Sequence, residues 1–171
     1  MLKSSPENEH VRDVAVYSVD PMHPTAASLS APKPTLFLDF DGVLHPNLAR
    51  PEQRFERMPL LAQTLEGAEL HIIISSSWRF EWSLSRLIGL FPTSLQSRVA
   101  GTTGQPYIGR HARWNEITAC CTERGITNWR ALDDAHFEFP NPCERLIRCE
   151  GSRGLGQEQC SALVAWLKEA V

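Results

Sequence analysis

Beyond residue 33, short apolar runs alternate along the chain with longer segments in which apolar residues recur at helical spacing. Runs of about four to eight apolar or β-branched residues between turn residues are typical of buried strands, and spacings of three and four residues are typical of helices. The pattern predicts strands over residues 35–38, 69–74, 95–101, 126–132 and 146–149, and helices over residues 58–67, 80–91, 112–124 and 157–170. Strands that alternate with helices in this way predict an α/β fold with a mostly parallel sheet and helices on both faces.

The first 33 residues do not follow this pattern. They are polar and charged at the start and rich in Pro, Ser and Ala toward the end, and residues 11–19 alternate loosely enough for an edge strand. Such a composition is typical of irregular segments. We therefore expect an irregular N-terminal arm over residues 1–33 and one globular domain over residues 34–171.

Composition narrows the function classes. The chain has 171 residues, of which 42% are hydrophobic, so it can build one full-sized core. Because its net charge is −3, the chain has no overall positive electrostatic field that would attract nucleic acid. A nucleic-acid partner would have to bind to a local basic patch. Five cysteines without a C-x-x-C pair favour reduced thiols and a cytoplasmic location. No run is long enough to span a membrane, so we expect no membrane partner, while the oligomeric state stays open.

Two acids follow the first predicted strand directly. Asp39 and Asp41 are separated by one residue and followed by Gly42. In an extended chain such carboxylates lie roughly 7 Å apart and repel each other by about 2 kcal/mol, which a hard cation such as Mg²⁺ would offset. Asp39 could then act as a nucleophile toward phosphorus, Asp41 could transfer protons, and Gly42 would let the backbone turn beside a phosphate. A solvated turn is the alternative; a calcium loop is disfavoured because the twelfth position is Arg50.

The run DFDGVLHP over residues 39–46 resembles the first motif of the haloacid dehalogenase (HAD) superfamily, in its phosphatase branch. Its HP ending is most similar to the HAD domains of Swiss-army-knife RNA-repair proteins. This resemblance implies a three-layer Rossmann-like fold, an Asp39 that becomes phosphorylated, an Asp41 that serves as acid and base, and a Mg²⁺ cofactor held with the help of both.

Later parts of the chain continue the resemblance in the same order. Ser75 follows the second predicted strand and matches the phosphate-binding second motif, with Ser76 as second choice and capping of the next helix as the alternative. Arg79 is a further candidate for phosphate contact, and Trp78 is either a base-stacking or a core residue. The cation of the third motif is assigned to Arg113, with Arg110 as the alternative.

The fourth motif falls at the end of the predicted strand 126–132. Asp133 and Asp134 follow it and are expected to complete the metal site together with Asp39 and Asp41. Because adjacent side chains point in opposite directions, one of the two is expected to ligate the metal directly, and Asp134 is slightly favoured. Glu138 is a weaker candidate ligand, and His136 is expected on the surface.

The short segments between these motifs leave no room for a large cap domain. The sequence therefore predicts a minimally capped, Mg²⁺-dependent phosphoester hydrolase with an aspartyl-phosphate intermediate. Its substrate would be a phosphorylated molecule, with RNA or DNA ends favoured by the open site and by a patch of arginines at positions 50, 54, 57 and 79. The alternatives are a phosphatase for a small phosphometabolite or nucleotide, and a non-catalytic HAD-like binding scaffold.

Overall fold

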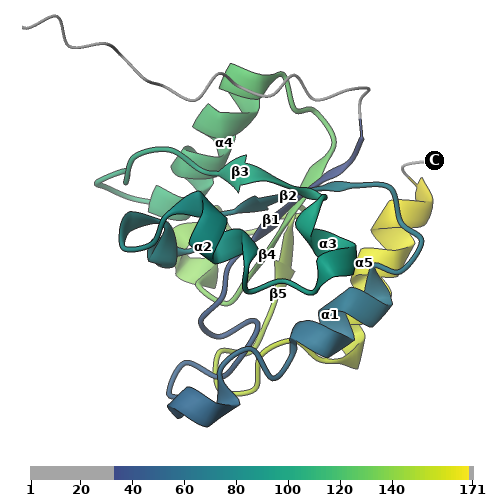
Figure 1. The fold of residues 1–171 in the computed structure, drawn as a ribbon. Coiled ribbons are helices and arrows are strands. Elements are labelled where there is room, and N and C mark those ends of the chain that lie inside the picture. Colours follow the sequence, from purple (N-terminus) through teal and green to yellow (C-terminus); the bar gives the residue numbers. More distant parts are fainter. Residues whose placement is uncertain (1–32, 170–171) are drawn as a thin grey trace, which may run out of the picture.

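A five-stranded parallel sheet lies at the centre of residues 33–169, the part of the chain that the computed structural model describes (Figure 1). Its strands are β1 (Thr35–Leu38), β2 (His71–Ile74), β3 (Val99–Thr102), β4 (Trp129–Asp133) and β5 (Leu146–Arg148), in the spatial order β3-β2-β1-β4-β5. All neighbouring strands pair in parallel, which confirms the predicted Rossmann-like α/β fold. The predicted arm and its edge strand at residues 11–19 lie outside the described residues, apart from Lys33.

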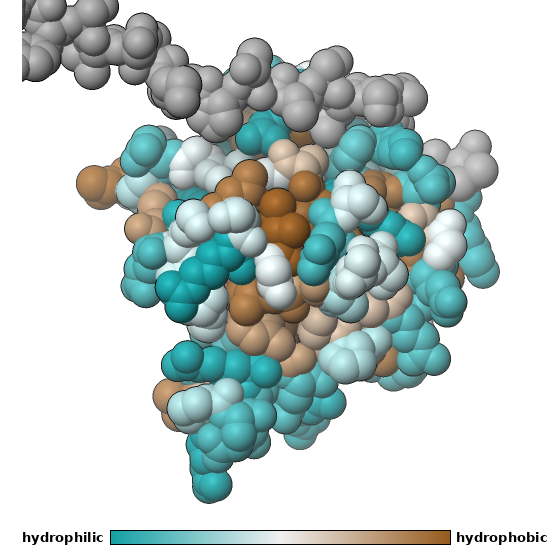
Figure 2. Space-filling model, viewed as in Figure 1, coloured by the Kyte–Doolittle hydropathy of each residue, from teal (hydrophilic) through white to brown (hydrophobic). Residues whose placement is uncertain are grey.

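Helices cover both faces of the sheet because successive side chains of each strand point in opposite directions. Leu36 and Leu38 of β1 belong to one core cluster, and Phe37 between them belongs to the other. The first face is covered by α1 (Met58–Thr64), α2 (Leu84–Ile88), α3 (Thr93–Gln96) and α5 (Gln157–Glu169), and the second by α4 (Ala112–Arg124). Figure 2 shows apolar side chains gathered in the middle of one face, over the region between the short helices α2 and α3.

Two predicted elements between β2 and β3 were wrong in their bounds. The single helix expected over residues 80–91 is a 3-10 turn, η2 (Ser77–Phe80), followed by α2. Ser83 separates them, because its backbone is extended and its hydroxyl accepts a hydrogen bond from the N–H of Arg86. The strand expected over residues 95–101 starts only at Val99, since Pro92 sets the chain for the short helix α3.

Only short segments cover the carboxyl edge of the sheet. The flap, residues 46–57, contains the helical turn η1 (Pro51–Gln53), and no strand is assigned within it. A further 3-10 turn, η3 (His136–Glu138), follows β4. Within residues 33–169 the minimal cap is thus confirmed, and the edge where the strands end is left open.

The outer edge of β3 is occupied by an arginine. Arg124, the last residue of α4, donates hydrogen bonds from its guanidinium to the carbonyl oxygens of Ala100 at 3.3 Å and Thr102 at 3.2 Å. It therefore satisfies acceptors that an edge strand otherwise leaves unpaired. None of the helices in the described part of the chain is long and apolar enough to cross a membrane.

Candidate active site

Polar residues end or follow four of the five strands at their shared carboxyl edge, and a glycine lies after the fifth. Asp39 follows β1, Ser75 follows β2, Thr103 follows β3, Asp133 ends β4, and Gly151 lies shortly after β5. In a doubly wound α/β sheet this edge is where ligands bind. The parallel topology thus brings together side chains that are far apart in the sequence.

Three carboxylates converge at the centre of this edge. Asp39, Asp133 and Asp134 each offer an oxygen atom, and these atoms lie within 4.8 Å of one another. Asp39 and Asp133 are buried, and Asp134 is half-buried. Three of the four predicted metal ligands therefore form one cluster, while the carboxylate of Asp41 is not part of it.

Arg113 lies beside this cluster. Its guanidinium is 3.8 Å from an oxygen of Asp39 and 3.6 Å from an oxygen of Asp133. The first turn of α4 carries it there, and Glu138 fixes that turn by accepting a hydrogen bond from the backbone N–H of Arg113 at 3.1 Å. The alternative, Arg110, is exposed and bonds to His111 instead. Of the two arginines, the geometry brings Arg113 to the site.

Burial dominates the electrostatics of the carboxylates. It raises the pKa of Asp39, although Arg113 and the backbone N–H of Phe40 lower that pKa in part. Burial and the charge of Asp39 raise the pKa of Asp133 to about 8. Burial lowers the pKa of Arg113, but the charges of Asp39 and Asp133 outweigh it, so the net shift is upward. The single charge of Arg113 cannot neutralise three ionised carboxylates. Keeping all three ionised therefore requires further positive charge at the site.

Two serine hydroxyls at the end of β2 have no hydrogen-bond partner. Ser75 and Ser76 are both fully buried, and within the described residues neither Oγ finds a donor or acceptor. Buried polar groups are nearly always paired in folded proteins, so an unpaired one requires an explanation. A bound phosphate oxygen at this edge would supply the missing acceptor.

The guanidinium of Arg79 is hydrogen-bonded within the protein. Its guanidinium donates to the carbonyl oxygens of Ser75 at 2.7 Å and Ser76 at 2.9 Å, and to Glu116 at 2.7 Å. The pair with Glu116 is almost fully buried. This arrangement favours a structural role for Arg79, which fixes the backbone of the serines, over the direct phosphate contact that its position in the sequence had suggested.

The carboxylate of Asp41 is held by two side chains. Trp78 Nε1 donates to one oxygen at 2.7 Å, and His45 Nε2 lies 3.0 Å from the other. Trp78 also packs against the core cluster, so the predicted core position and a contact at the site are combined in one residue. His136, by contrast, is exposed, as expected.

A second polar contact connects the flap with the cluster. Asn47 donates from Nδ2 to Asp134 at 2.8 Å and from its backbone N–H to the carbonyl oxygen of Gly151 at 2.8 Å. A methyl group on Gly42 or on Gly151 would overlap Asp134, and Gly42 also has a φ of +69°. Gly42 was expected to let a phosphate approach the backbone. The space that a side chain at this position would occupy is instead filled by Asp134 and Asn47.

The residues present fit a hard divalent cation. Their ligand atoms are carboxylate oxygens, which Mg²⁺ prefers, and one of them, Oδ2 of buried Asp133, accepts no hydrogen bond within residues 33–169. Asn47 supplies the outer contact that orients Asp134. Asp39, Asp133 and Asp134 are therefore the residues that would hold such a cation.

Sequence reasoning missed three residues that shape the site. His45 could have been identified from the sequence. It directly follows the apolar pair Val43-Leu44, and a histidine that is buried with such residues requires a polar partner. Gly151 follows the last strand, so the rule for carboxyl edges could have identified it. Asn47 gave no signal, since its bond to Asp134 joins residues 87 positions apart.

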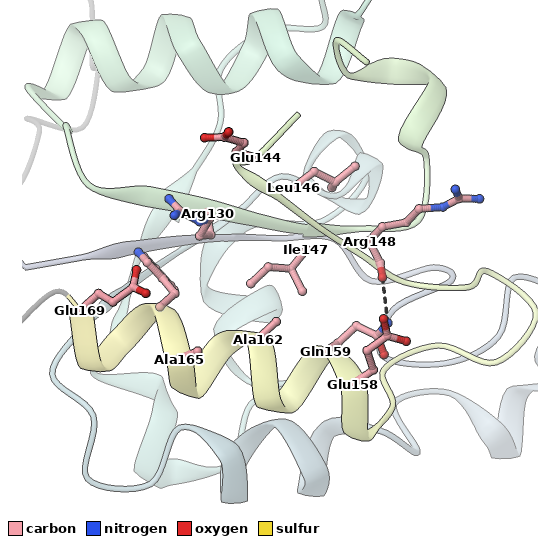
Figure 3. A pocket seen from close by; sticks show the side chains of 11 residues that line it. Arg130, Glu144, Leu146, Ile147, Arg148, Glu158, Gln159, Ala162, Ala165 and Glu169 are labelled. Atoms are coloured by element: carbon pink, nitrogen blue, oxygen red, sulfur yellow. Dashed lines mark hydrogen bonds between the residues drawn. The ribbon is translucent and has the colours of Figure 1, made fainter. Parts of the chain in front are cut away.

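A hollow on another part of the molecule does not compete with this site. It has a volume of about 440 Å³ and lies between β5 and α5, where Gln159 donates a hydrogen bond to the carbonyl oxygen of Arg148 (Figure 3). Its lining contains arginines and glutamates but none of the clustered aspartates. The chemistry is concentrated at the carboxyl edge.

Comparison with known protein families identifies a related domain. A family model described as "HAD domain in Swiss Army Knife RNA repair proteins" matches residues 35–160, a range that contains every residue of the cluster. No curated protein and no solved structure matches the chain.

Replacing Asp133 with Asn should change how stability depends on pH. Because Asp133 has a pKa of about 8 in the folded chain and about 4 when unfolded, the folded state holds an extra proton between these values, and the free energy of unfolding of the metal-free chain falls as pH rises. The variant cannot ionise, so in EDTA it should be more stable than the wild type at pH 8, on the order of a few kcal/mol, and similar at pH 4 to 5. Thermal unfolding across this range measures the effect.

Mg²⁺ provides the matched comparison for this variant. At pH 8 it should raise the melting temperature of the wild type and of Glu52→Gln, an exposed control, but not that of Asp133→Asn. A stability difference between Asp133→Asn and the wild type that is the same at every pH would contradict the assignment.

Gly151→Ala should weaken Mg²⁺ binding by roughly tenfold or more, because the added methyl group displaces Asn47 and Asp134. Calorimetric titration with Mg²⁺ measures it. Gly104→Ala is the matched control, since a Cβ at Gly104 meets no atom within 4 Å. Equal affinity in both variants would show that the Asn47–Asp134 contact does not support the metal site.

Proposed function

Because the chain belongs to the family of HAD domains found in Swiss Army Knife RNA repair proteins, we propose that it is a Mg²⁺-dependent phosphoester hydrolase that works through an aspartyl-phosphate. The observation that carries the proposal is the convergence of Asp39, Asp133 and Asp134 beside Arg113, next to the unpaired hydroxyls of Ser75 and Ser76. The cluster of acids, cation and hydroxyls supplies the groups that phosphoryl transfer requires.

The phosphate of the substrate would be held by charge and by hydrogen bonds. Arg113 has one buried nitrogen, Nη1, with no hydrogen-bond partner within residues 33–169, and this nitrogen is free to donate to a phosphate oxygen. Ser75 and Ser76 donate to another without adding charge. Mg²⁺, when bound to the aspartates, would neutralise them and the phosphate, so that an anionic substrate can approach an anionic nucleophile.

The first step transfers the phosphoryl group to the chain. An oxygen of Asp39 forms a bond to phosphorus while the bond from phosphorus to the ester oxygen breaks. Asp39 is oriented for this by the backbone N–H of Phe40, which donates to Oδ1 at 2.8 Å and leaves Oδ2 on the side of Arg113. Asp41 donates a proton to the departing ester oxygen, which leaves as an alcohol.

The second step restores the nucleophile. A water molecule attacks the phosphorus of the aspartyl-phosphate, Asp41 accepts the proton that the water loses, and the bond between phosphorus and Asp39 breaks. The products are inorganic phosphate and free Asp39. Because 43% of the Asp41 side chain is exposed, water and a leaving group can both reach it.

Asp39→Asn should reduce phosphate release by at least about a thousandfold, because the amide cannot attack phosphorus. The assay compares wild type and variant on an aryl phosphate and on a phosphorylated oligonucleotide, with Mg²⁺ and with EDTA. The melting temperature should not fall, since the substitution removes a buried charge. Glu52→Gln is the control with full activity. Wild-type turnover that survives Asp39→Asn would remove Asp39 as the nucleophile.

Nucleic-acid ends are the substrate class that the surroundings of the site favour. Leu48, Phe80, Leu84, Tyr107, Ile108 and Phe137 are the exposed large apolar side chains of the described residues, and all six lie in segments that follow the carboxyl ends of strands. Arg50 and Arg54 of the flap are exposed on the same edge. Apolar side chains beside arginines can stack bases and contact phosphates, and the open edge admits a long chain.

The substrate class is tested by the flap arginines. Arg50→Gln with Arg54→Gln should raise KM for a 3′- or 5′-phosphorylated RNA oligonucleotide by roughly tenfold and reduce its salt dependence, with no change for the aryl phosphate. Arg148→Gln is the matched control, because Arg148 is exposed on β5 beside the hollow of Figure 3. Higher efficiency on the aryl phosphate than on the oligonucleotide would favour a small phosphorylated metabolite or nucleotide instead.

A further inference from the structure

Asp41 is the one proposed catalytic carboxylate that lies outside the acid cluster, and both of its oxygens are engaged. Oδ2 accepts a hydrogen bond from Trp78 Nε1 at 2.7 Å, and Oδ1 lies 3.0 Å from His45 Nε2. The two partners come from different segments, the turn after β1 and the turn after β2. A carboxylate fixed at both oxygens has a single orientation, whereas a side chain with 43% exposure would otherwise sample several rotamers.

The direction of the histidine bond follows from its other nitrogen. His45 Nδ1 lies 3.3 Å from the backbone nitrogen of Phe55, whose N–H can only donate. Nδ1 is therefore the acceptor and carries no proton in a neutral ring, so the proton resides on Nε2 and is donated to Asp41. The flap residue Phe55 thus sets the tautomer that lets His45 hold Asp41.

Aromatic packing fixes both donors. His45 is 2% exposed, and its ring lies 5.1 Å from that of Phe55 and 6.1 Å from that of Trp78. The rings of Phe55 and Trp78 are 5.4 Å apart, and Phe40 contacts both. Phe55 has a φ of +63°, which is unfavourable for a side chain of this size, so its packed ring holds the backbone N–H where His45 needs it.

We propose that His45 and Trp78 are positioning residues that hold the carboxylate of Asp41 for proton transfer, and that the flap takes part through Phe55. This inference rests on the proposed function. Neither residue contacts the acid cluster in the hydrogen bonds described, so each acts through Asp41. Their loss should lower the rate of the chemical steps and leave phosphate binding unchanged, since Arg113 and the serines are untouched.

The kinetic test removes each donor with little change in ring packing. Trp78→Phe and His45→Phe should each lower kcat by about tenfold or more on whichever substrate the wild type hydrolyses, with KM changed less than twofold. His45→Gln keeps an N–H donor near the position of Nε2 and should retain more activity than His45→Phe. Trp82→Phe is the matched control, because the ring of Trp82 packs at a tilt against that of Trp78, with centroids 4.9 Å apart, and its indole N–H makes no hydrogen bond within residues 33–169.

Nuclear magnetic resonance tests the contacts without any substrate. Nitrogen-15 spectra should show the proton of His45 on Nε2, and Asp41→Ala should shift the indole N–H resonance of Trp78 and leave that of Trp82 in place. A proton on Nδ1 of His45, or a Trp78 resonance that does not shift in Asp41→Ala, would show that these side chains do not hydrogen-bond to Asp41 as described.

The outcomes separate this inference from the proposed function. A wild type that releases no phosphate from any substrate would overturn the proposed function and the role inferred from it. An active wild type whose Trp78→Phe and His45→Phe variants keep its kcat would overturn the positioning role alone. The positioning role would be established by a lower kcat in Trp78→Phe and in His45→Phe, a partly recovered kcat in His45→Gln and an unchanged kcat in Trp82→Phe.

Discussion

The site depends on negative charge that is buried without enough positive charge to balance it. Asp39 and Asp133 lie out of solvent beside a half-buried Asp134, and Arg113 is the one cation of the described residues that reaches them. Such an arrangement persists only where the surrounding fold over-determines it, because each carboxylate would be better solvated in water. The parallel sheet provides that constraint, since adjacent β1 and β4 end side by side and cannot separate their acids.

Much of the fold was predictable from the sequence because its strands are buried on both faces and read as apolar runs. Thr35–Leu38 and the helix Ala112–Arg124 were predicted with their observed bounds. The region between β2 and β3 was not, because periodicity alone cannot show that Ser83 interrupts a helix or that Pro92 starts a new one. Local capping interactions decide such boundaries, and they involve hydrogen bonds that the apolar pattern does not report.

The candidate site was predictable in its acids and in Arg113, because these residues directly follow strands or open a helix. Its supporting contacts were not. Arg79 was a predicted candidate for phosphate contact, yet four protein oxygens accept hydrogen bonds from its guanidinium. The bonds from Asn47 to Asp134 and from Trp78 to Asp41 span 87 and 37 residues, and only the folded chain brings those partners together. Motif order identifies groups that react, whereas tertiary contacts decide which groups merely hold them.

The arginine at the end of α4 also bears on how this chain behaves among copies of itself. A sheet with an open edge can grow when a foreign strand donates its N–H groups to the unpaired carbonyls. At β3 such a strand would first have to displace Arg124 from the oxygens of Ala100 and Thr102 and leave its charge without those partners. By occupying these two acceptors, Arg124 opposes the pairing of a foreign strand with β3, while the carboxyl ends of the strands stay uncovered.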